Sequence, residues 1–378
     1  LDTYTKLFQT ASGSIMNSNA VSNFYANPNL KPEIHKELEL GIEGRFWKNR
    51  IGIDVSLYSK DSEDLIIDLE LDPSTGYTSS TVNSAAINNK GIEAIVNVIP
   101  VQTQNFTWDI SANFTLNRSE VTKIADGIDQ VLIAGASFLG NFAKPGLPYN
   151  MIWGAPILRY YTDPNTTVED IPYDKRKDYS PVTSSAGIYQ YAGSDGFIGD
   201  PNPDYVVNVT NTISYKWITL RAQVDHTVGG DIWGGTASTL TGRGILESTG
   251  FDRSVPVVVS GVDKDGNPNK VQVTPNAHYW RDTGVWYDEN RIFDASTIRL
   301  REISLSLVAP KSWLNGTPFG RASLTISGQN LWHLAYNFPS SSNMDPEVLS
   351  LGVGNGKGFD RTTGPTSKKY GATLSFTF

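Results

Sequence analysis

Strict alternation of apolar and polar residues marks several stretches of this chain. From Tyr370 to the final residue, Phe378, every second side chain is apolar and the residues between them are Gly, Thr and Ser. A period of two predicts a β-strand with one apolar face and one wet face. From this segment alone, a strand of a soluble sandwich and a strand that faces lipid are equally good interpretations.

The same pattern predicts nine strands, at about 37–46, 51–58, 92–99, 106–117, 206–215, 218–225, 297–308, 321–332 and 370–378. In 106–117, two Phe, a Trp, an Ile and a Leu share one unbroken face. A soluble strand rarely carries such a face, so this stretch favours contact with lipid. In 297–308 the phase slips near Arg301 and Glu302, as a β-bulge would produce.

The connections alternate in length. Short ones are expected at 47–50, 100–105 and 216 and a moderate one at 309–320, whereas 60–90, 118–204, 230–295 and 334–367 are long and irregular. Residues 1–30 are predicted as a polar loop. Up-and-down outer-membrane barrels have short periplasmic turns and long external loops.

Tryptophan falls at three of the four shorter connections, as Trp47, Trp217 and Trp313. An aromatic girdle at the membrane interface would lie there. The fold class predicted is therefore all-β, a transmembrane antiparallel up-and-down β-barrel. Bacterial single-chain barrels have even strand numbers, so nine strands predict part of a barrel.

Composition narrows the function. The net charge is −8 and no basic stripe appears, which argues against a nucleic-acid partner. No cysteine is present, so disulfides and thiolate chemistry are unavailable. No apolar run reaches the roughly 18–20 residues of a membrane helix.

Enzymatic motifs are not found, and we predict no enzyme. The four histidines are scattered without a zinc-binding pair, and the glycine-rich stretch 352–358 lacks phosphate-loop spacing. A glycoside hydrolase of β architecture would instead need two carboxylates roughly 5–10 Å apart in a cleft.

The polar faces of the predicted strands carry too many charges for a dry core. They suit the wall of a water-filled lumen that holds a plug, or a solvent face in the soluble alternative. The residues are Glu37, Glu39, Glu43, Arg45, Asp54, Asp109, Arg221 and Asp225.

Aromatic residues in the long connections are the candidates for cargo contact, because flat rings with a polar handle suit sugars and peptide side chains alike. Loop packing and interfacial anchoring are the alternative roles. The candidates are Trp153, Tyr160, Tyr161, Tyr189, Tyr191, Trp233, Trp280, Trp286, Tyr287, Trp332 and Tyr336.

One carboxylate-rich turn, containing Asp263, Asp265 and Asn267, resembles the first half of a calcium loop. It lacks the later bidentate Glu, and an ordinary Asp-Gly turn explains the same residues without metal. No cofactor is therefore expected, with a structural calcium ion at this turn as the alternative.

Several segments together resemble the SusC/RagA family of TonB-dependent outer-membrane transporters of Bacteroidetes. Each is weak alone, but their order and spacing cover nearly the whole chain. They are Asn27-Pro-Asn-Leu-Lys-Pro-Glu, Asn89-Lys-Gly-Ile-Glu, Gly199-Asp-Pro-Asn-Pro-Asp-Tyr, Ile298-Arg-Leu-Arg-Glu-Ile-Ser-Leu, Leu324-Thr-Ile-Ser-Gly-Gln-Asn-Leu-Trp and Tyr370-Gly-Ala-Thr-Leu-Ser-Phe-Thr-Phe.

The resemblance implies a barrel of about 22 strands in the bacterial outer membrane, plugged by an N-terminal domain and capped by a SusD-like lipoprotein. It implies import of glycan or peptide cargo, powered through TonB. Residues 1–378 would be the C-terminal portion of the barrel, without the plug, and TonB would act through the missing N-terminal part. Phe378 looks like the signal read by the barrel-assembly machinery. The alternative is a surface β-rich glycan-binding protein that transports nothing.

Overall fold

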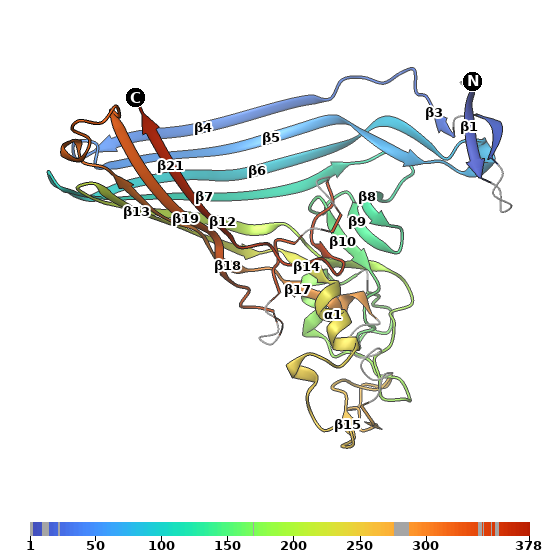
Figure 1. Cartoon of the computed structure of the whole chain (residues 1–378). Helices are drawn as coiled ribbons and strands as arrows, with labels where there is room; N and C mark the ends of the chain where they lie inside the picture. Colours follow the sequence, from blue (N-terminus) through green and yellow to red (C-terminus); the bar gives the residue numbers. More distant parts are fainter. Residues whose placement is uncertain are drawn as a thin grey trace.

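The computed structural model describes residues 3–9, 15–21, 23–168, 170–275, 287–338, 342, 344–348, 350–351 and 355–378. Its main feature is one long, curved antiparallel sheet (Figure 1). Along the sheet the strands follow the order β21-β19-β18-β13-β12-β7-β6-β5-β4. They are β4 (Ile34–Phe46), β5 (Ile51–Glu70), β6 (Ser79–Gln102), β7 (Phe106–Lys123), β12 (Pro203–Tyr215), β13 (Ile218–Gly229), β18 (Thr297–Val308), β19 (Arg321–Leu334) and β21 (Lys369–Thr377).

The nine predicted strands are thus confirmed, each paired with its neighbour in sequence. Among the described strands, β4 and β21 lie at the two open edges of the sheet. The bulge in β18 is also confirmed, because the register with β19 shifts between Leu300 and Glu302.

The prediction that 60–90 is an irregular excursion is wrong. β5 and β6 continue as paired strands to Glu70 and from Ser79, so only 71–78 connect them. Polar residues such as Asp61 and Ser62 hid this extension, because strands that project beyond lipid no longer need an apolar outer face.

One face of the sheet is apolar and the other is polar. Paired residues in an antiparallel sheet point to the same side, so each lateral row can be assigned to a face. One outer row runs through Ile42, Val55, Ala94, Phe114 and Val207. The neighbouring inner row runs through Glu43, Asp54, Ile95, Asn113 and Asn208.

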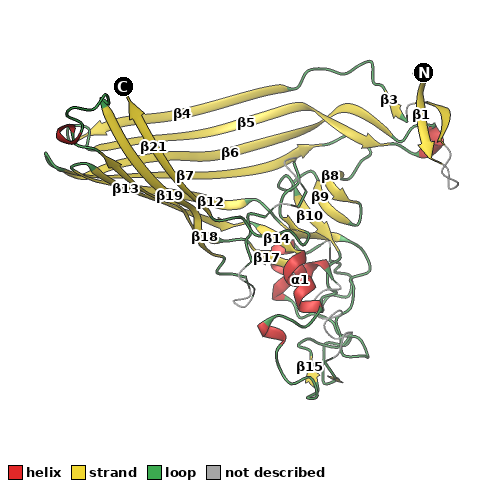
Figure 2. Cartoon of the chain, viewed as in Figure 1, coloured by secondary structure: helices red, strands yellow, loops and turns green. Residues whose placement is uncertain are grey.

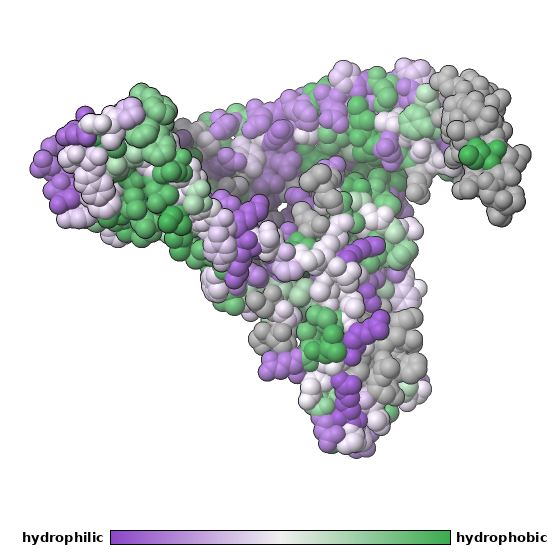
Figure 3. Space-filling model, in the orientation of Figure 1, coloured by the Kyte–Doolittle hydropathy of each residue, from purple (hydrophilic) through white to green (hydrophobic). Residues whose placement is uncertain are grey.

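The outer face has the dimensions of a membrane-spanning band. On β12, the outward residues from Tyr205 to Tyr215 span the roughly 9–11 residues that a tilted strand needs to cross a bilayer. In Figure 3, apolar residues gather over the end of the sheet formed by β18, β19 and β21, and polar residues cover the far wall formed by β4 to β6.

Gly91, in the Asn89–Glu93 motif, leaves room for an aromatic ring on the inner face. Tyr58 lies over it and donates a hydrogen bond to Asn117 Oδ1 at 3.0 Å. A Cβ on Gly91 would lie 2.4 Å from the Tyr58 ring and 2.5 Å from the Leu116 carbonyl oxygen.

We therefore expect Gly91→Ala to destabilise the barrel by about 1–3 kcal/mol, because the ring and a backbone carbonyl must both shift. Gly52→Ala on the adjacent strand is the matched control, since its Cβ would meet Asn97 at an ordinary 3.8 Å. Heat-dependent gel mobility of the full-length protein measures the difference. Equal melting of both variants would show that Tyr58 is not held in this way.

The long connections are more ordered than the sequence suggests. Residues 118–204 include a four-stranded sheet, β8 (Val131–Ala136), β9 (Leu139–Ala143), β10 (Met151–Gly154) and β11 (Gly196–Gly199). Residues 230–295 and the last connection contribute β14 (Asp231–Gly234), α1 (Gly235–Gly242), β15 (Val257–Val258), β16 (Gln272–Val273), β17 (Ile292–Asp294) and β20 (Phe359–Asp360). Figure 2 shows these short strands and the helix below the large sheet.

Short 3-10 helices complete the connections: η1 (Pro73–Thr75), η2 (Tyr173–Asp178), η3 (Glu247–Thr249), η4 (Asp288–Arg291) and η5 (Lys311–Trp313). No helix in the described part of the chain is long and apolar enough to cross a membrane. At the N-terminus, β1 (Thr3–Gln9) pairs with β2 (Ile15–Val21) and β3 (Phe24–Tyr25) runs along β6, where a polar loop was predicted.

The three longest connections, between β7 and β12, β13 and β18, and β19 and β21, pack together into what we call the loop body. Its central core consists of Leu139, Ile152, Ile198, Trp233, Ile292 and Phe359, which come from all three. Hydrogen bonds also cross between them: Asn141 Nδ2 donates to the Lys357 carbonyl at 3.1 Å, and Thr236 Oγ1 donates to Asp360 Oδ1 at 2.8 Å.

Candidate functional site: inner wall, loop body and clefts

The eight charged residues predicted to face a lumen all lie on the inner face of the sheet. Glu43 is opposite Asp54, Arg221 is opposite Thr212, and Asp225 is opposite Asn208. Their companions are Glu37, Glu39, Arg45 and Asp109. Whether they hold a plug stays a prediction.

On β4 to β7 this wall is strongly acidic. A groove of about 440 Å³ is lined by three glutamates, Glu37, Glu39 and Glu93, with Lys60 as its basic residue. Open carboxylates on a concave wall create a negative potential there.

A buried charge network ties the loop body to the inner wall. Arg299 on β18 is fully buried and pairs with Asp345 of the last connection, and it also approaches Glu347 Oε2 at 3.3 Å. Arg301 forms ion pairs with Asp225 on the wall and with Glu347. The distance from Arg301 Nη2 to Glu347 Oε1 is 2.6 Å. The last connection is therefore fastened across the inside of the sheet.

Thr366 adds hydrogen bonds to the Asp345 carboxylate from its backbone and its hydroxyl. Burial would raise the pKa of Asp345, but the hydrogen bonds from Thr366 and Arg299 outweigh burial and hold the pKa below its ordinary value. Asp345 is thus charged at neutral pH. Sequence analysis predicted Asp225 as an inner-wall residue but missed the other members of this network. The two arginines in the Ile298–Leu305 motif, which both face inward, were the signal that could have indicated it.

Two predicted cargo residues, Tyr160 and Tyr161, line a cleft of the loop body that has a volume of about 900 Å³. Arg159 beside them pairs with Glu289 and donates to the Tyr179 carbonyl at 3.2 Å. The hydroxyl of Tyr161 is buried without a hydrogen-bond partner in the described chain.

Other predicted cargo residues serve internal contacts. Tyr287 is buried and donates its hydroxyl proton to the Tyr189 carbonyl at 3.0 Å. Tyr191 donates to Asp195 Oδ1 at 2.8 Å, and burial together with this bond raises the pKa of Tyr191 to about 12.

Trp153 and Trp233 lie in the packing of the loop body. The Trp153 ring meets those of Phe142 and Phe197 at centroid distances of 5.6 and 5.1 Å. Trp233 is 6% exposed, donates to Asp288 Oδ1 at 3.0 Å, and is one of the residues that line a shallow cleft.

Trp332 lies in a strand and not in a long connection, which corrects its predicted location, whereas Tyr336 lies in the last connection as predicted. Trp332 belongs to β19 and is opposite Leu300 in an outward row. The Tyr336 hydroxyl is 3.1 Å from Nε2 of His226, which is itself outward-facing on β13. Trp280 and Trp286 lie outside the described residues.

The predicted girdle residues lie in the short connections, with Trp47 between β4 and β5, Trp217 between β12 and β13, and Trp313 in η5. Trp217 and Trp313 are neighbours, with ring centroids 5.4 Å apart, and Trp47 is 78% exposed. Phe378 is also exposed, and its ring is 5.3 Å from that of Phe319. An assembly role of Phe378 remains a prediction.

The carboxylate-rich turn is closed by its own hydrogen bonds. Asp263 Oδ1 accepts from the backbone N–H groups of Asp265 and Asn267, both at 2.9 Å. These bonds lower the pKa of Asp263. No group of three or more His, Cys, Asp or Glu suited to a metal occurs among the described residues. These hydrogen bonds account for the conformation of the turn without a metal ion. A calcium ion at this turn stays a prediction.

An acidic junction links β11 to β14. Asp231 is mostly buried, and its Oδ2 accepts from the Asp200 N–H at 2.9 Å, while Asp200 caps Asn202. Burial, reinforced by the neighbouring Asp200 and Asp294, raises the pKa of Asp231 to about 6.

A raised carboxyl pKa means that the fold binds a proton more tightly than the unfolded chain. The junction should therefore be most stable at low pH and lose stability as the pH rises through about 6. Asp231→Asn should strengthen it at pH 7.5 by roughly 1–3 kcal/mol and remove this pH dependence. Hydrogen exchange of 196–202 and 229–234 measures it, with the exposed Asp126→Asn as control. Weaker protection in Asp231→Asn at pH 7.5 would contradict the expectation.

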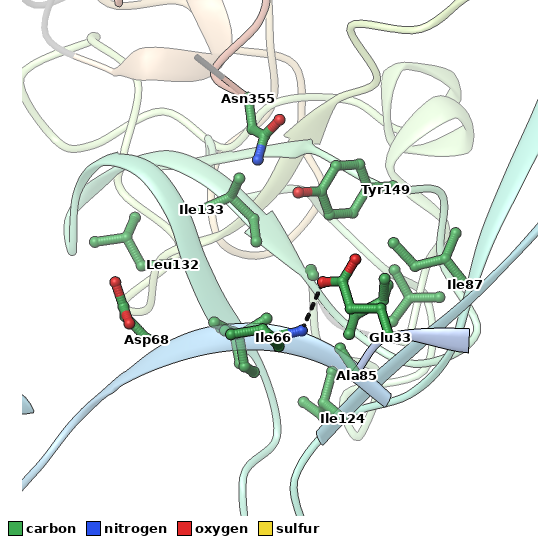
Figure 4. A pocket seen from close by; sticks show the side chains of 15 residues that line it. Glu33, Ile66, Asp68, Ala85, Ile87, Ile124, Leu132, Ile133, Tyr149 and Asn355 are labelled. Atoms are coloured by element: carbon green, nitrogen blue, oxygen red, sulfur yellow. Dashed lines mark hydrogen bonds between the residues drawn. The ribbon is translucent and has the colours of Figure 1, made fainter. Parts of the chain in front are cut away.

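A partly open cavity of about 340 Å³, lined mainly by aliphatic residues, lies against the inner wall, where the β8–β9 hairpin covers β5, β6 and β7 (Figure 4). Its polar groups are the carboxylates of Glu33 and Asp68, the Tyr149 hydroxyl and the Asn355 amide. The aliphatic lining consists of Leu65, Ile66, Ile67, Ala85, Ile87, Val121, Ile124, Val131, Leu132, Ile133 and Ala143. Sequence analysis missed this site because 60–90 was taken for a loop.

Comparison with known proteins decides the family. The family model for the TonB dependent receptor-like β-barrel matches residues 3–225, more than half of the chain. The chain belongs to the TonB-dependent receptor β-barrel family. This confirms the resemblance, the partial barrel and the outer-membrane location. The named relatives below are receptors and transporters rather than enzymes.

The relatives of this TonB-dependent receptor chain are longer. TonB-dependent receptor P3 of Formosa agariphila is 27% identical over 86% of the chain and 31% of the relative. TonB-dependent receptor SusC of Bacteroides thetaiotaomicron is 24% identical over 68% of the chain and 26% of SusC. The chain spans about a third of the length of the curated relatives it matches.

The solved RagAB peptide transporter has the same fold. It superposes with a TM-score of 0.68 at 20% identity, covering all of this chain and 38% of the transporter chain. The RagAB peptide importer in its open-open state gives a TM-score of 0.63 at 19% identity.

Proposed function

We propose that this chain is the C-terminal barrel portion of a nutrient importer that takes up oligosaccharides or oligopeptides. A SusD-like surface lipoprotein would cap it, and TonB would supply the work. The observation that carries this proposal is the two-faced sheet, apolar outside and acidic inside, with a packed loop body fastened across its inner face. The RagAB neighbour, a peptide transporter, supports the peptide branch.

The alternative, a glycan-binding surface protein without transport, is supported less. It would use the clefts of the loop body but would have no need for a charged inner wall. A peptide backbone and its side chains also fit a cleft edged by Tyr160 and Tyr161, so the clefts alone do not separate the two functions.

Uptake by cells that produce the full-length receptor with its lipoprotein tests the proposal. Fluorescent oligopeptides or oligosaccharides should accumulate inside the outer membrane, and an uncoupler of the proton-motive force should abolish accumulation. Binding at the surface without uncoupler-sensitive accumulation would favour the alternative.

A further inference from the structure

The aliphatic cavity lies where the inner wall changes character. Lower on the wall, the inward residues are polar, such as Glu37 and Glu39. Further out, the inward positions become Ile87 and Val121, and the β8–β9 hairpin packs on them. This packing leaves about 340 Å³ open, although unfilled volume lowers stability. Ligand pockets begin at about 300 Å³, so the space suits one residue-sized group.

The lining combines mainly aliphatic residues with a few polar groups. Eleven of the fifteen lining residues are aliphatic, and Tyr149 is the one aromatic ring. Each sugar hydroxyl buried there without a partner would cost about 1–3 kcal/mol. An apolar side chain loses nothing on entering and gains about 1.5–3 kcal/mol from burial.

The mouth of the cavity is anionic. Glu33 Oε1 accepts from the Ile66 N–H at 2.9 Å, which holds the carboxylate in place, as the dashed line in Figure 4 shows. Glu33 Oε2 also lies 3.7 Å from His35 Nε2. Asp68 lies on the other side of Ile66 in Figure 4 and accepts a hydrogen bond from Thr81 Oγ1 at 2.6 Å. The Tyr149 hydroxyl also lines the cavity. The Glu33 carboxylate is the group that would bind an ammonium ion.

We propose that this cavity is a pocket for the first residue of a peptide cargo. Its aliphatic interior binds an apolar side chain, and the Glu33 carboxylate binds the α-ammonium group of the same residue. This inference rests on the proposed import function and names its cargo as peptides with a free, apolar N-terminus. The acidic groove of Glu37, Glu39 and Glu93 favours positively charged cargo in the same way.

Titration calorimetry on the full-length receptor tests the proposal with four probes. These are Leu-Ala-Ala-Ala, Gly-Ala-Ala-Ala, N-acetyl-Leu-Ala-Ala-Ala and the neutral glycan maltotetraose. We expect the free leucyl peptide to bind about tenfold more tightly than the glycyl or acetylated peptide. Equal affinity for the leucyl and glycyl peptides, or for the free and acetylated ones, would overturn the proposal. So would tighter binding of maltotetraose.

Variants locate the effect. Glu33→Gln keeps the acceptor for Ile66 and removes the charge, so it should cost the free leucyl peptide about tenfold and leave the acetylated peptide unchanged. Glu63→Gln, an exposed carboxylate paired with Lys36, is its control. Ala143→Leu should fill the cavity and remove the preference for leucine over glycine, whereas the exposed Ala186→Leu should not.

Failure of this pocket is distinguishable from failure of import. Uncoupler-sensitive uptake of peptides or glycans with no first-residue preference would overturn the pocket and keep the importer. Absence of any uncoupler-sensitive uptake would overturn the proposed function itself. If Ala143→Leu fails to reach the membrane, the comparison of Glu33→Gln with Glu63→Gln still decides.

Discussion

Arg299→Met is expected to release the last long connection from the inner wall. The variant leaves Asp345 buried without its partner, and an uncompensated buried charge costs about 3–5 kcal/mol. Opening of the connection should therefore become more than about a hundredfold easier. Hydrogen exchange of 344–348 and 355–366 in the full-length receptor measures this, and protease cleavage in the same region should increase in parallel.

Arg321→Met is the matched control, because Arg321 is an exposed arginine on the neighbouring strand. A double variant distinguishes loss of the Arg299–Asp345 ion pair from general destabilisation of the fold. When Asp345→Leu accompanies Arg299→Met, both charges leave the interior, so the combined loss should be smaller than the sum of the single losses. Unchanged exchange in Arg299→Met, or a fully additive double variant, would mean that the pair does not fasten the connection.

Val209→Arg is expected to prevent stable insertion of the barrel. Val209 faces outward near the middle of the apolar band, between Ala112 and Val224. An arginine at the bilayer midplane of a β-barrel costs about 2–4 kcal/mol. Outer-membrane levels and heat-resistant folding of the full-length receptor should both fall sharply.

The neighbouring Thr210→Arg provides the control, because Thr210 faces the wet interior of the same strand, opposite Ser111 and Gln223. We expect it to fold at close to the normal level. Equal loss in both variants, or normal insertion of Val209→Arg, would contradict the assignment of the two faces.

The alternating pattern was enough to predict the nine strands, because one lipid-facing side forces a period of two on each of them. The bulge near Glu302 and the charged inner face were predicted by the same reasoning. The alternating pattern no longer predicts strands where β5 and β6 extend beyond the lipid bilayer. Ile67, Leu69 and Ile87 looked irregular because they cover an inner face under the β8–β9 hairpin instead of facing lipid.

The loop body could not be predicted, because its contacts join residues far apart in sequence. Trp233 was a candidate for cargo contact on residue type alone. Its position in the core depends on Ile152 and Phe359, which come from two other connections. Arg299 and Asp345 likewise became a pair only through the fold. Residue type predicts which chemistry is available, whereas long-range packing decides whether it points at a ligand.

Nitroxide labels placed along β12 test the central claim most directly, and no native cysteine within these 378 residues competes for the label. Labels at 207, 209, 211 and 213 should collide readily with lipid-dissolved oxygen in reconstituted full-length receptor, and those at 206, 208, 210 and 212 should not. A strict alternation is the predicted result. Low oxygen collision at all eight positions would show that the apolar faces meet a dry protein interior, and the outer-membrane barrel would be refuted.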